Sequence, residues 1–134
     1  MLFVKTYVDK SRINGAGVGL FAGQDIKKGE VVWDFTEGFD LRFGKDKISE
    51  IEKILPNMGE FIERYGYMER NGGEGFIVLS FDNARFINHS PNPNLDDKRD
   101  KTYALRDIKK GAELLCNYSH FSTHDGDREF NERL

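Results

Sequence analysis

The sequence predicts a mainly β protein with a short helical insert. Three observations support this fold class: short runs rich in β-branched and aromatic residues, 14 glycines that punctuate them, and one region of clear helical periodicity. The runs at residues 2–8, 17–23 and 30–35 are expected to be strands. A chain of 134 residues is expected to form one domain, and its single cysteine excludes an internal disulfide.

Helical periodicity is confined to the middle of the chain. In residues 46–55 the apolar side chains recur three or four positions apart and form one stripe. The members of the stripe are Ile48, Ile51, Ile54 and Leu55. Pro56 is expected to end this helix, and residues 59–67 are expected to form a second, shorter one. Both helices are expected to cover a sheet.

Two polar segments complete the outline. Residues 91–101 contain proline, asparagine and many charged side chains, which predicts an exposed loop. Residues 119–134 read as a polar tail that carries the aromatic residues Phe121 and Phe130.

The sequence Asp-Ile-Lys-Lys-Gly occurs twice, at residues 25–29 and 107–111, each time between two predicted strands. Aspartate can accept a hydrogen bond from nearby backbone, and glycine permits positive φ, so both copies suit a turn. The pattern alone leaves open whether the copies are a coincidence of two good turns or have a shared structural use.

The charge balance indicates which classes of binding partner to expect. Twenty basic and 23 acidic side chains give a net charge of −3, so we expect no direct nucleic acid binding and tolerance of lysine-rich partners. No apolar stretch approaches the roughly 18 residues of a membrane span, and residues 1–10 lack a signal-peptide core. We therefore expect an intracellular protein that does not bind membranes.

Residues 15–22, Gly-Ala-Gly-Val-Gly-Leu-Phe-Ala, place glycines at alternate positions. This spacing lets a ligand approach the backbone closely, although it is not the dinucleotide-binding pattern. An ordinary glycine-rich strand entry remains the simpler interpretation.

Residues 85–94, Arg-Phe-Ile-Asn-His-Ser-Pro-Asn-Pro-Asn, follow an apolar run, and Phe86 and Ile87 look buried. Asn88 and His89 lie side by side and offer donors and acceptors of fixed direction, suited to a purine edge or a zwitterion. Taken singly, Asn88 could equally cap a turn and His89 could be a satisfied core imidazole.

The last apolar run, Ala-Glu-Leu-Leu-Cys-Asn-Tyr at residues 112–118, ends in Tyr118, with Cys116 on the same face of a regular strand. Zinc held by Cys116, His120 and His124 is an alternative, but it needs a helix where the pattern indicates a strand. A thiol hydrolase using Cys116 and His89 lacks a recognisable oxyanion hole.

Four blocks in this order resemble the SET domain of protein lysine methyltransferases. Gly-Val-Gly-Leu-Phe-Ala followed by Asp-Ile-Lys-Lys-Gly-Glu resembles the first block, and Val-Val-Trp-Asp-Phe stands where the second is expected. Arg-Phe-Ile-Asn-His-Ser-Pro-Asn-Pro-Asn is similar to the highly specific third block, and Gly-Ala-Glu-Leu-Leu-Cys-Asn-Tyr to the fourth. The resemblance spans about residues 3–121. It gives the repeated Asp-Ile-Lys-Lys-Gly a use, since SET domains place such a turn in both halves.

The resemblance implies a β-clip fold of small twisted sheets around a knot-like crossing, with residues 41–75 as the variable insert. It implies S-adenosylmethionine as the cofactor and a lysine channel ending at the catalytic residue Tyr118. The implied cofactor contacts are Gly17, Val18, Gly19, Arg85, Asn88, His89 and Phe121. The implied channel residues are Phe35, Cys116 and Tyr118, and no metal is implied.

The implied activity is methyl transfer to a lysine side chain of a protein or peptide, such as a histone or another basic protein. The chain is expected to work in the cytoplasm or on chromatin. Similarity to minimal stand-alone SET proteins implies that two chains pair into a homodimer to cover the site, with Phe121 and Phe130 as further cover.

The second block departs from the family pattern, because Phe35 replaces a tyrosine and the following glycine is displaced. This departure keeps an alternative open: a weak or inactive SET-derived module that binds peptide or cofactor. Cys116 replaces a larger aromatic residue, which predicts room for a di- or trimethylated product.

Overall fold

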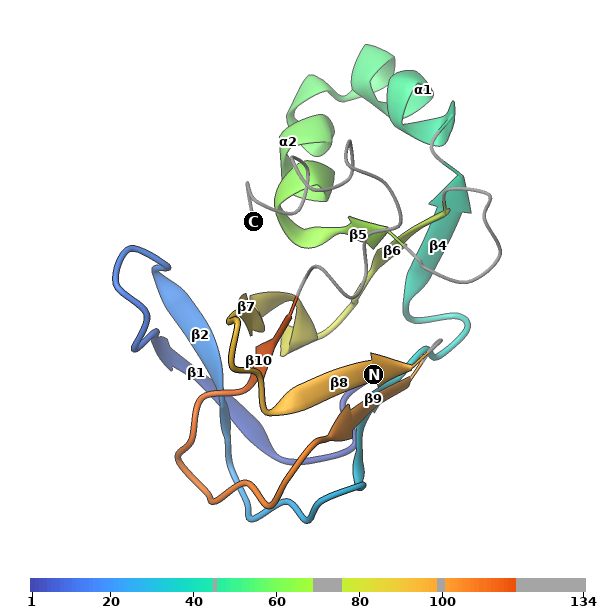
Figure 1. The fold of residues 1–134 in the computed structure, drawn as a ribbon. Helices are drawn as coiled ribbons and strands as arrows, with labels where there is room; N and C mark the ends of the chain where they lie inside the picture. The colour runs from blue at the N-terminus through green and yellow to red at the C-terminus, as the bar shows by residue number, and fades with distance from the viewer. Residues whose placement is uncertain (45, 69–75, 99–100, 118–134) are drawn as a thin grey trace.

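The computed structural model describes residues 1–44, 46–68, 76–98 and 101–117, and it has the predicted mainly β fold (Figure 1). The strands are β1 (Thr6–Lys10), β2 (Val18–Ala22), β3 (Val31–Asp34), β4 (Leu41–Gly44), β5 (Tyr67–Met68), β6 (Phe76–Leu79), β7 (Asn88–His89), β8 (Leu95–Lys98), β9 (Lys101–Ala104) and β10 (Leu115–Cys116). The helices are α1 (Asp46–Ile54), α2 (Pro56–Tyr65) and the 3-10 helix η1 (Asn83–Phe86). None of the helices described is long and apolar enough to cross a membrane.

These strands form several small sheets. β1 pairs with β2, β3 and β8 flank β9, and β4 and β5 flank β6, all antiparallel. The exception is β10, which runs parallel to β7. In Figure 1, α1 and α2 lie at one end of the molecule over the β4-β6-β5 sheet, and β8 and β9 lie toward the other end.

The main hydrophobic core lies where the β1–β2, β3-β9-β8 and β7–β10 sheets meet. Its buried members include residues from both ends of the chain, with Leu20, Leu95 and Leu114 inaccessible to solvent. A second cluster surrounds Trp33, and a third joins Ile62 of α2 to Ile77 of β6. Close packing of sequence-distant segments therefore holds the small sheets together.

The helices are confirmed, but only half of the predicted apolar stripe packs. Ile48 and Ile51 contact the cluster of Ile62 and Ile77. Ile54 and Leu55 are 78% and 56% exposed, which corrects their prediction as covered residues. The chain turns at Leu55 because Pro56 starts α2, so the end of α1 leaves the sheet.

Two strand predictions were wrong in detail. Residues 2–8 were expected to be one strand, but Leu2 forms only an isolated bridge with Trp33, and β1 begins at Thr6. The predicted exposed loop at 91–101 contains β8, because Leu95 is fully buried in the main core and its neighbours pair with β9. The sequence did not indicate a strand here because three of the four residues of β8 are charged.

The two Asp-Ile-Lys-Lys-Gly copies bind each other. Ile26 and Ile108 exchange two backbone hydrogen bonds of 2.8 and 2.7 Å. Asp25 Oδ1 accepts a bond from the Lys110 backbone N–H, and Asp107 Oδ1 accepts one from the Lys28 N–H, both at 2.9 Å. The repeat is therefore a reciprocal pair of turns and no coincidence.

The same pairing continues beyond the turns. Gly29 N–H donates to Ala104 and Gly111 N–H donates to Ala22, each at 2.8 Å, and both glycines have φ near +90°. Only glycine adopts that conformation without strain, which explains its place at the end of each copy. We name this arrangement, residues 25–29 with 107–111, the paired turns.

The segment after η1 is tied to β10. Asn94 donates its side-chain N–H to Glu113 O and accepts the Leu115 N–H through Oδ1, both at 2.8 Å. Phe86 and Ile87, expected to be buried, are half-buried and pack against the main core. The parallel β7–β10 pair brings the third and fourth sequence blocks together, whereas the knot-like crossing itself stays a prediction.

Candidate functional site

The glycine-rich segment meets the motif at Asn88 where β2 begins. Gly17 has φ +76°, and its carbonyl accepts the Ser11 N–H at 2.8 Å, which turns the chain back toward β1. One residue later, Val18 O accepts a 2.9 Å hydrogen bond from Asn88 Nδ2. A single amide therefore joins the first and third sequence blocks.

A buried carboxylate, Glu113, lies behind this junction. It is 6% exposed and accepts hydrogen bonds from Ser11 Oγ at 2.6 Å, from Arg12 N–H at 2.9 Å and from Asn88 Nδ2 at 3.3 Å. Three donors from two separate segments converge on it, as a buried carboxylate requires. Glu113 thus holds the fourth block against the first and third.

Gly19 lets this carboxylate approach the backbone. A Cβ placed on Gly19 would overlap Glu113 Oε1 and would lie 3.2 Å from Asn88 Nδ2. Here glycine is required by close approach and not by positive φ. The alternating glycines therefore have two different uses, a turn at Gly17 and a cradle at Gly19.

The junction fixes the direction of the Asn88 amide. Both of its hydrogen bonds use Nδ2, because both partners are acceptors. Its Oδ1 consequently remains an acceptor beside the backbone of Val18, whose side chain is 46% exposed. A ligand with a donor group, such as an ammonium, would suit this position.

Sequence reasoning assigned no role to Glu113. The signal was present, because a glutamate inside the apolar run at 112–118 must find donors if that run is buried. What could not be read was the identity of those donors, since Ser11 and Arg12 lie about a hundred residues away in the chain.

Two further predicted cofactor residues lie close by. His89 follows Asn88 in β7 and is exposed at its surface, yet partial burial lowers the pKa of its imidazole. The guanidinium of Arg85 lies 4.7 Å from the ring centre of Phe86 and 5.9 Å from that of Tyr65. It also donates to Phe81 O and Asp82 O, so the side chain of Arg85 is held in place.

Two of the three predicted channel residues, Phe35 and Cys116, lie in adjacent clusters. Phe35 is half-buried beside Trp33, with ring centres 6.5 Å apart and edge to face. The Arg42 guanidinium lies 4.8 Å from the centre of the Phe35 ring. Cys116 is 4% exposed in the main core, and Ile87 packs against both clusters.

The environment of Cys116 argues against a thiol nucleophile. Burial, with smaller contributions from Asp97 and Asp96, raises the pKa of its thiol far above the usual range. A nucleophilic cysteine needs the opposite shift. The thiol hydrolase alternative is therefore rejected.

Several predicted residues lie outside the described residues: Tyr118, Phe121, Phe130 and the histidines 120 and 124. The structure places Cys116 in a strand, where the zinc alternative needed a helix. Among residues 1–44, 46–68, 76–98 and 101–117, no group of three or more His, Cys, Asp or Glu side chains could hold a metal ion.

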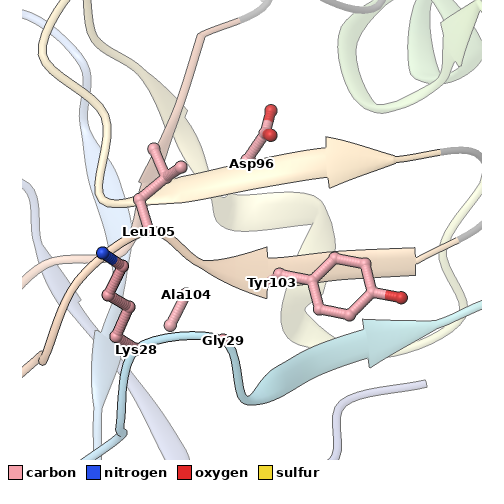
Figure 2. Close-up of a pocket in the computed structure, with 6 residues that line it drawn as sticks. All are labelled: Lys28, Gly29, Asp96, Tyr103, Ala104 and Leu105. Atoms are coloured by element: carbon pink, nitrogen blue, oxygen red, sulfur yellow. The ribbon is translucent and has the colours of Figure 1, made fainter.

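A separate cleft of about 410 Å³ opens on the outer face of β8 and β9 (Figure 2). Its lining residues are Lys28, Gly29, Asp96, Tyr103, Ala104 and Leu105. None of the predicted site residues contributes to it. The candidate site is accordingly the junction around Asn88, and the cleft is a distinct surface feature.

The model of the SET domain family matches residues 17–119. The chain belongs to the SET domain family. The matched range contains all four sequence blocks, and it includes Gly19, Asn88 and Glu113 of the junction.

Named relatives are histone-lysine methyltransferases. The chain is 29% identical over 124 residues to histone-lysine N-methyltransferase EZH2 of Chaetomium thermophilum, covering 81% of this chain and 8% of the relative. It is 31% identical over 122 residues to histone-lysine N-methyltransferase trr of Drosophila melanogaster, covering 84% and 5%. The SET domain thus spans less than a tenth of those relatives.

The fold is also similar to solved structures. The Polycomb Repressive Complex 2 of Chaetomium thermophilum, in an autoinhibited conformation bound to S-adenosylmethionine, aligns with a TM-score of 0.71 at 27% identity. The alignment covers 96% of this chain and 17% of that chain. An active Polycomb Repressive Complex 2 in the basal state aligns with a TM-score of 0.61 at 26% identity, covering 86% and 15%.

Proposed function

We propose that this SET domain transfers methyl groups from S-adenosylmethionine to the side-chain amine of lysine in a protein substrate. The observation that carries the proposal is the junction in which Asn88 and Glu113 join the glycine-rich segment. Family membership supports it, because the matched range includes Gly19, Asn88 and Glu113.

The described residues fit the cofactor. A Cβ on Gly17 would meet no atom within 4 Å, so the backbone there borders open space. The Asn88 Oδ1 acceptor would bind the ammonium of the cofactor's methionine part, and the backbone of residues 17–19 would pack along it. Arg85, His89 and Phe121 complete the proposed contacts. When bound, the cofactor supplies a methyl group on a positively charged sulfur.

The substrate lysine must lose a proton before it reacts. Its pKa in water is about 10.4, and an ammonium has no lone pair for attack. A channel bordered by Phe35 and its aromatic neighbours removes water, and a nearby positive sulfur repels the charged amine. Both effects favour the neutral amine, whose proton passes to water.

We assign positioning and electrostatic stabilisation to Tyr118. Its hydroxyl would orient the amine and the methyl group in line, where most of the rate acceleration of a displacement arises. A phenol of pKa about 10 is a weak base at neutral pH, so general-base catalysis by Tyr118 is not part of the proposal.

Radiolabelled cofactor tests the activity directly. Purified full-length protein is incubated with labelled cofactor and a mixture of histones and other lysine-rich proteins. We expect label transfer that Tyr118→Phe reduces at least about 100-fold. Tyr103→Phe removes a hydroxyl from the outer cleft and should leave transfer unchanged.

Cofactor binding is measured separately by calorimetry. Asn88→Ala should weaken binding about tenfold or more, because it removes the acceptor of a charge-assisted bond. Asn92→Ala, in the exposed turn of the same block, is the matched control. Equal affinities of the two variants would remove Asn88 from the binding site.

One observation favours the alternative of a binding module. Phe35 lacks the family hydroxyl, and the only cation described at its ring is the Arg42 guanidinium. Tight cofactor binding without transfer to any tested protein would favour that module over the enzyme. Transfer that depends on Tyr118 would exclude it.

The substrate class and product follow from the same site. We propose a lysine in a histone or another basic protein, matched to an acidic net charge of −3, and therefore an intracellular, chromatin-associated or cytoplasmic enzyme. With Cys116 in place of a bulkier residue, mass spectrometry should detect di- or trimethyl product. Light scattering should detect a dimer if two chains pair to cover the site.

A further inference from the structure

Four lysines gather at the paired turns. Lys27 and Lys28 come from the first turn, and Lys109 and Lys110 from the second. All four are exposed, and Figure 1 places the two turn segments at the end of the molecule opposite α1 and α2. We name these four residues the lysine surface.

The turns hold the lysine surface together by rigid backbone contacts. The Ile26–Ile108 bridge fixes the distance between the copies, and each aspartate binds the backbone N–H of a lysine in the other copy. The two Lys-Lys pairs are therefore presented symmetrically about the bridge. Little backbone ordering remains to be lost when a ligand binds.

The carboxylates of the two turn segments accept hydrogen bonds from backbone N–H groups. Asp25 and Asp107 accept the bonds described above, and Glu30 Oε2 accepts the Lys27 backbone N–H at 3.0 Å. None of the four lysines forms an ion pair with any residue of the described ranges. By contrast, Lys101 lies 3.8 Å from the carboxylate of Asp34.

The local charge has the opposite sign to the whole chain. Residues 23–30 and 105–111 carry five cationic and three acidic side chains, whereas the full chain has a net charge of −3. Total charge, from which no nucleic acid binding was expected, conceals this distribution. Electrostatic attraction depends on the local surface because salt screens charges beyond about 10 Å.

We propose that the lysine surface docks on the phosphate backbone of a nucleic acid duplex. Its two symmetric pairs of point charges suit the phosphates of two strands, and lysine binds phosphate without base preference. Leu105, 40% exposed, is the only large apolar exposed side chain in these two segments, which disfavours insertion into a membrane. This surface is independent of the proposed methyl transfer.

The test is fluorescence anisotropy of a labelled duplex of about 20 base pairs, titrated with the full-length protein over a range of salt concentrations. If all four lysines contact phosphates, the slope of log affinity against log salt should be about −3.6. The paired substitutions K27Q/K28Q and K109Q/K110Q should each reduce its magnitude by about 2, and equally. K47Q/K53Q on α1 makes the same charge change elsewhere and should leave the slope unchanged.

Three outcomes would overturn the proposal. They are no measurable binding, equal loss from the α1 control, and a lysine dependence that is as strong with polyglutamate or anionic vesicles as with the duplex. Circular dichroism and peptide methylation by each variant exclude unfolding, since neither readout depends on this surface.

Discussion

The paired turns and the junction at Glu113 are both assembled from segments far apart in the chain, but they use the sequence in opposite ways. In the paired turns the same residues occur twice and satisfy each other reciprocally. At the offset that relates Asp25 to Asp107, Glu113 corresponds to Val31. The repeat therefore diverges where the site is built.

The two corresponding positions, Val31 and Glu113, therefore have different roles. Val31 is half-buried in β3 and pairs with Tyr103 across the sheet. Glu113, its counterpart, places a buried carboxylate beneath the glycine segment and the Asn88 amide. The position that packs in the first half is a hydrogen-bonding centre in the second.

Substitution of Glu113 and of Val31 should give the largest difference in unfolding free energy. Glu113→Ala removes the acceptor of three hydrogen bonds, one of them from the buried Ser11 hydroxyl, and we expect the free energy of unfolding to fall by about 3 kcal/mol. Val31→Ala removes two methyl groups from a half-buried strand position and should cost about 1 kcal/mol. Urea unfolding measures both. Equal losses would mean that Glu113 contributes only packing.

The next largest effect is expected at the glycine cradle. Gly19→Ala forces a Cβ against Glu113 Oε1, and we expect a loss of about 2 kcal/mol in unfolding free energy. Gly44 in β4 has no atom within 4 Å of an added Cβ and no positive φ, so Gly44→Ala should change stability by less than about 0.5 kcal/mol. Thermal unfolding of the two variants decides whether close approach matters; similar melting temperatures would contradict it.

Within the paired turns the expected effects are smaller and matched. Asp25→Ala and Asp107→Ala each remove one exposed bond to a backbone N–H, which should cost about 1 kcal/mol. Because the turns are reciprocal, the two losses should be equal. A difference of more than about 1 kcal/mol by urea unfolding would show that the two copies are not equivalent.

The smallest effect concerns pH. The thiol pKa of Cys116 is raised in the folded state, so its stabilising contribution is complete below the unfolded pKa of about 8.5 and falls as pH rises above it. Between about pH 7.5 and pH 9 the loss should approach 0.8 kcal/mol in unfolding free energy. The same measurement on Cys116→Ala should lack this component. An identical pH dependence of the two proteins would refute the assignment.

Local patterns predicted the helices, the β2 and β3 strands and the fold class. They succeeded because periodicity and turn residues act over a few positions. They did not predict that Leu95 is buried, because its neighbours in the sequence are charged. They wrongly predicted that Ile54 and Leu55 are covered, because the apolar stripe extends beyond the surface against which α1 packs. Those outcomes depend on tertiary packing that no short window contains.

The candidate site was also predicted only in part. The order of sequence blocks indicated that Val18 and Asn88 belong to one site, and the structure joins them with one hydrogen bond. Glu113 was missed because its partners Ser11 and Arg12 carry no special pattern of their own. The positions of Tyr118 and Phe121 lie outside the described residues, so their roles stay proposals.

The reciprocal bonds of the paired turns also constrain how the chain reaches its native state. During synthesis the first copy emerges long before the second, and Ser11 and Arg12 emerge about a hundred residues before Glu113. Contacts of such long sequence separation form late and slow folding. A nascent chain that has not yet released residue 113 from the ribosome therefore lacks the carboxylate at the centre of the candidate site.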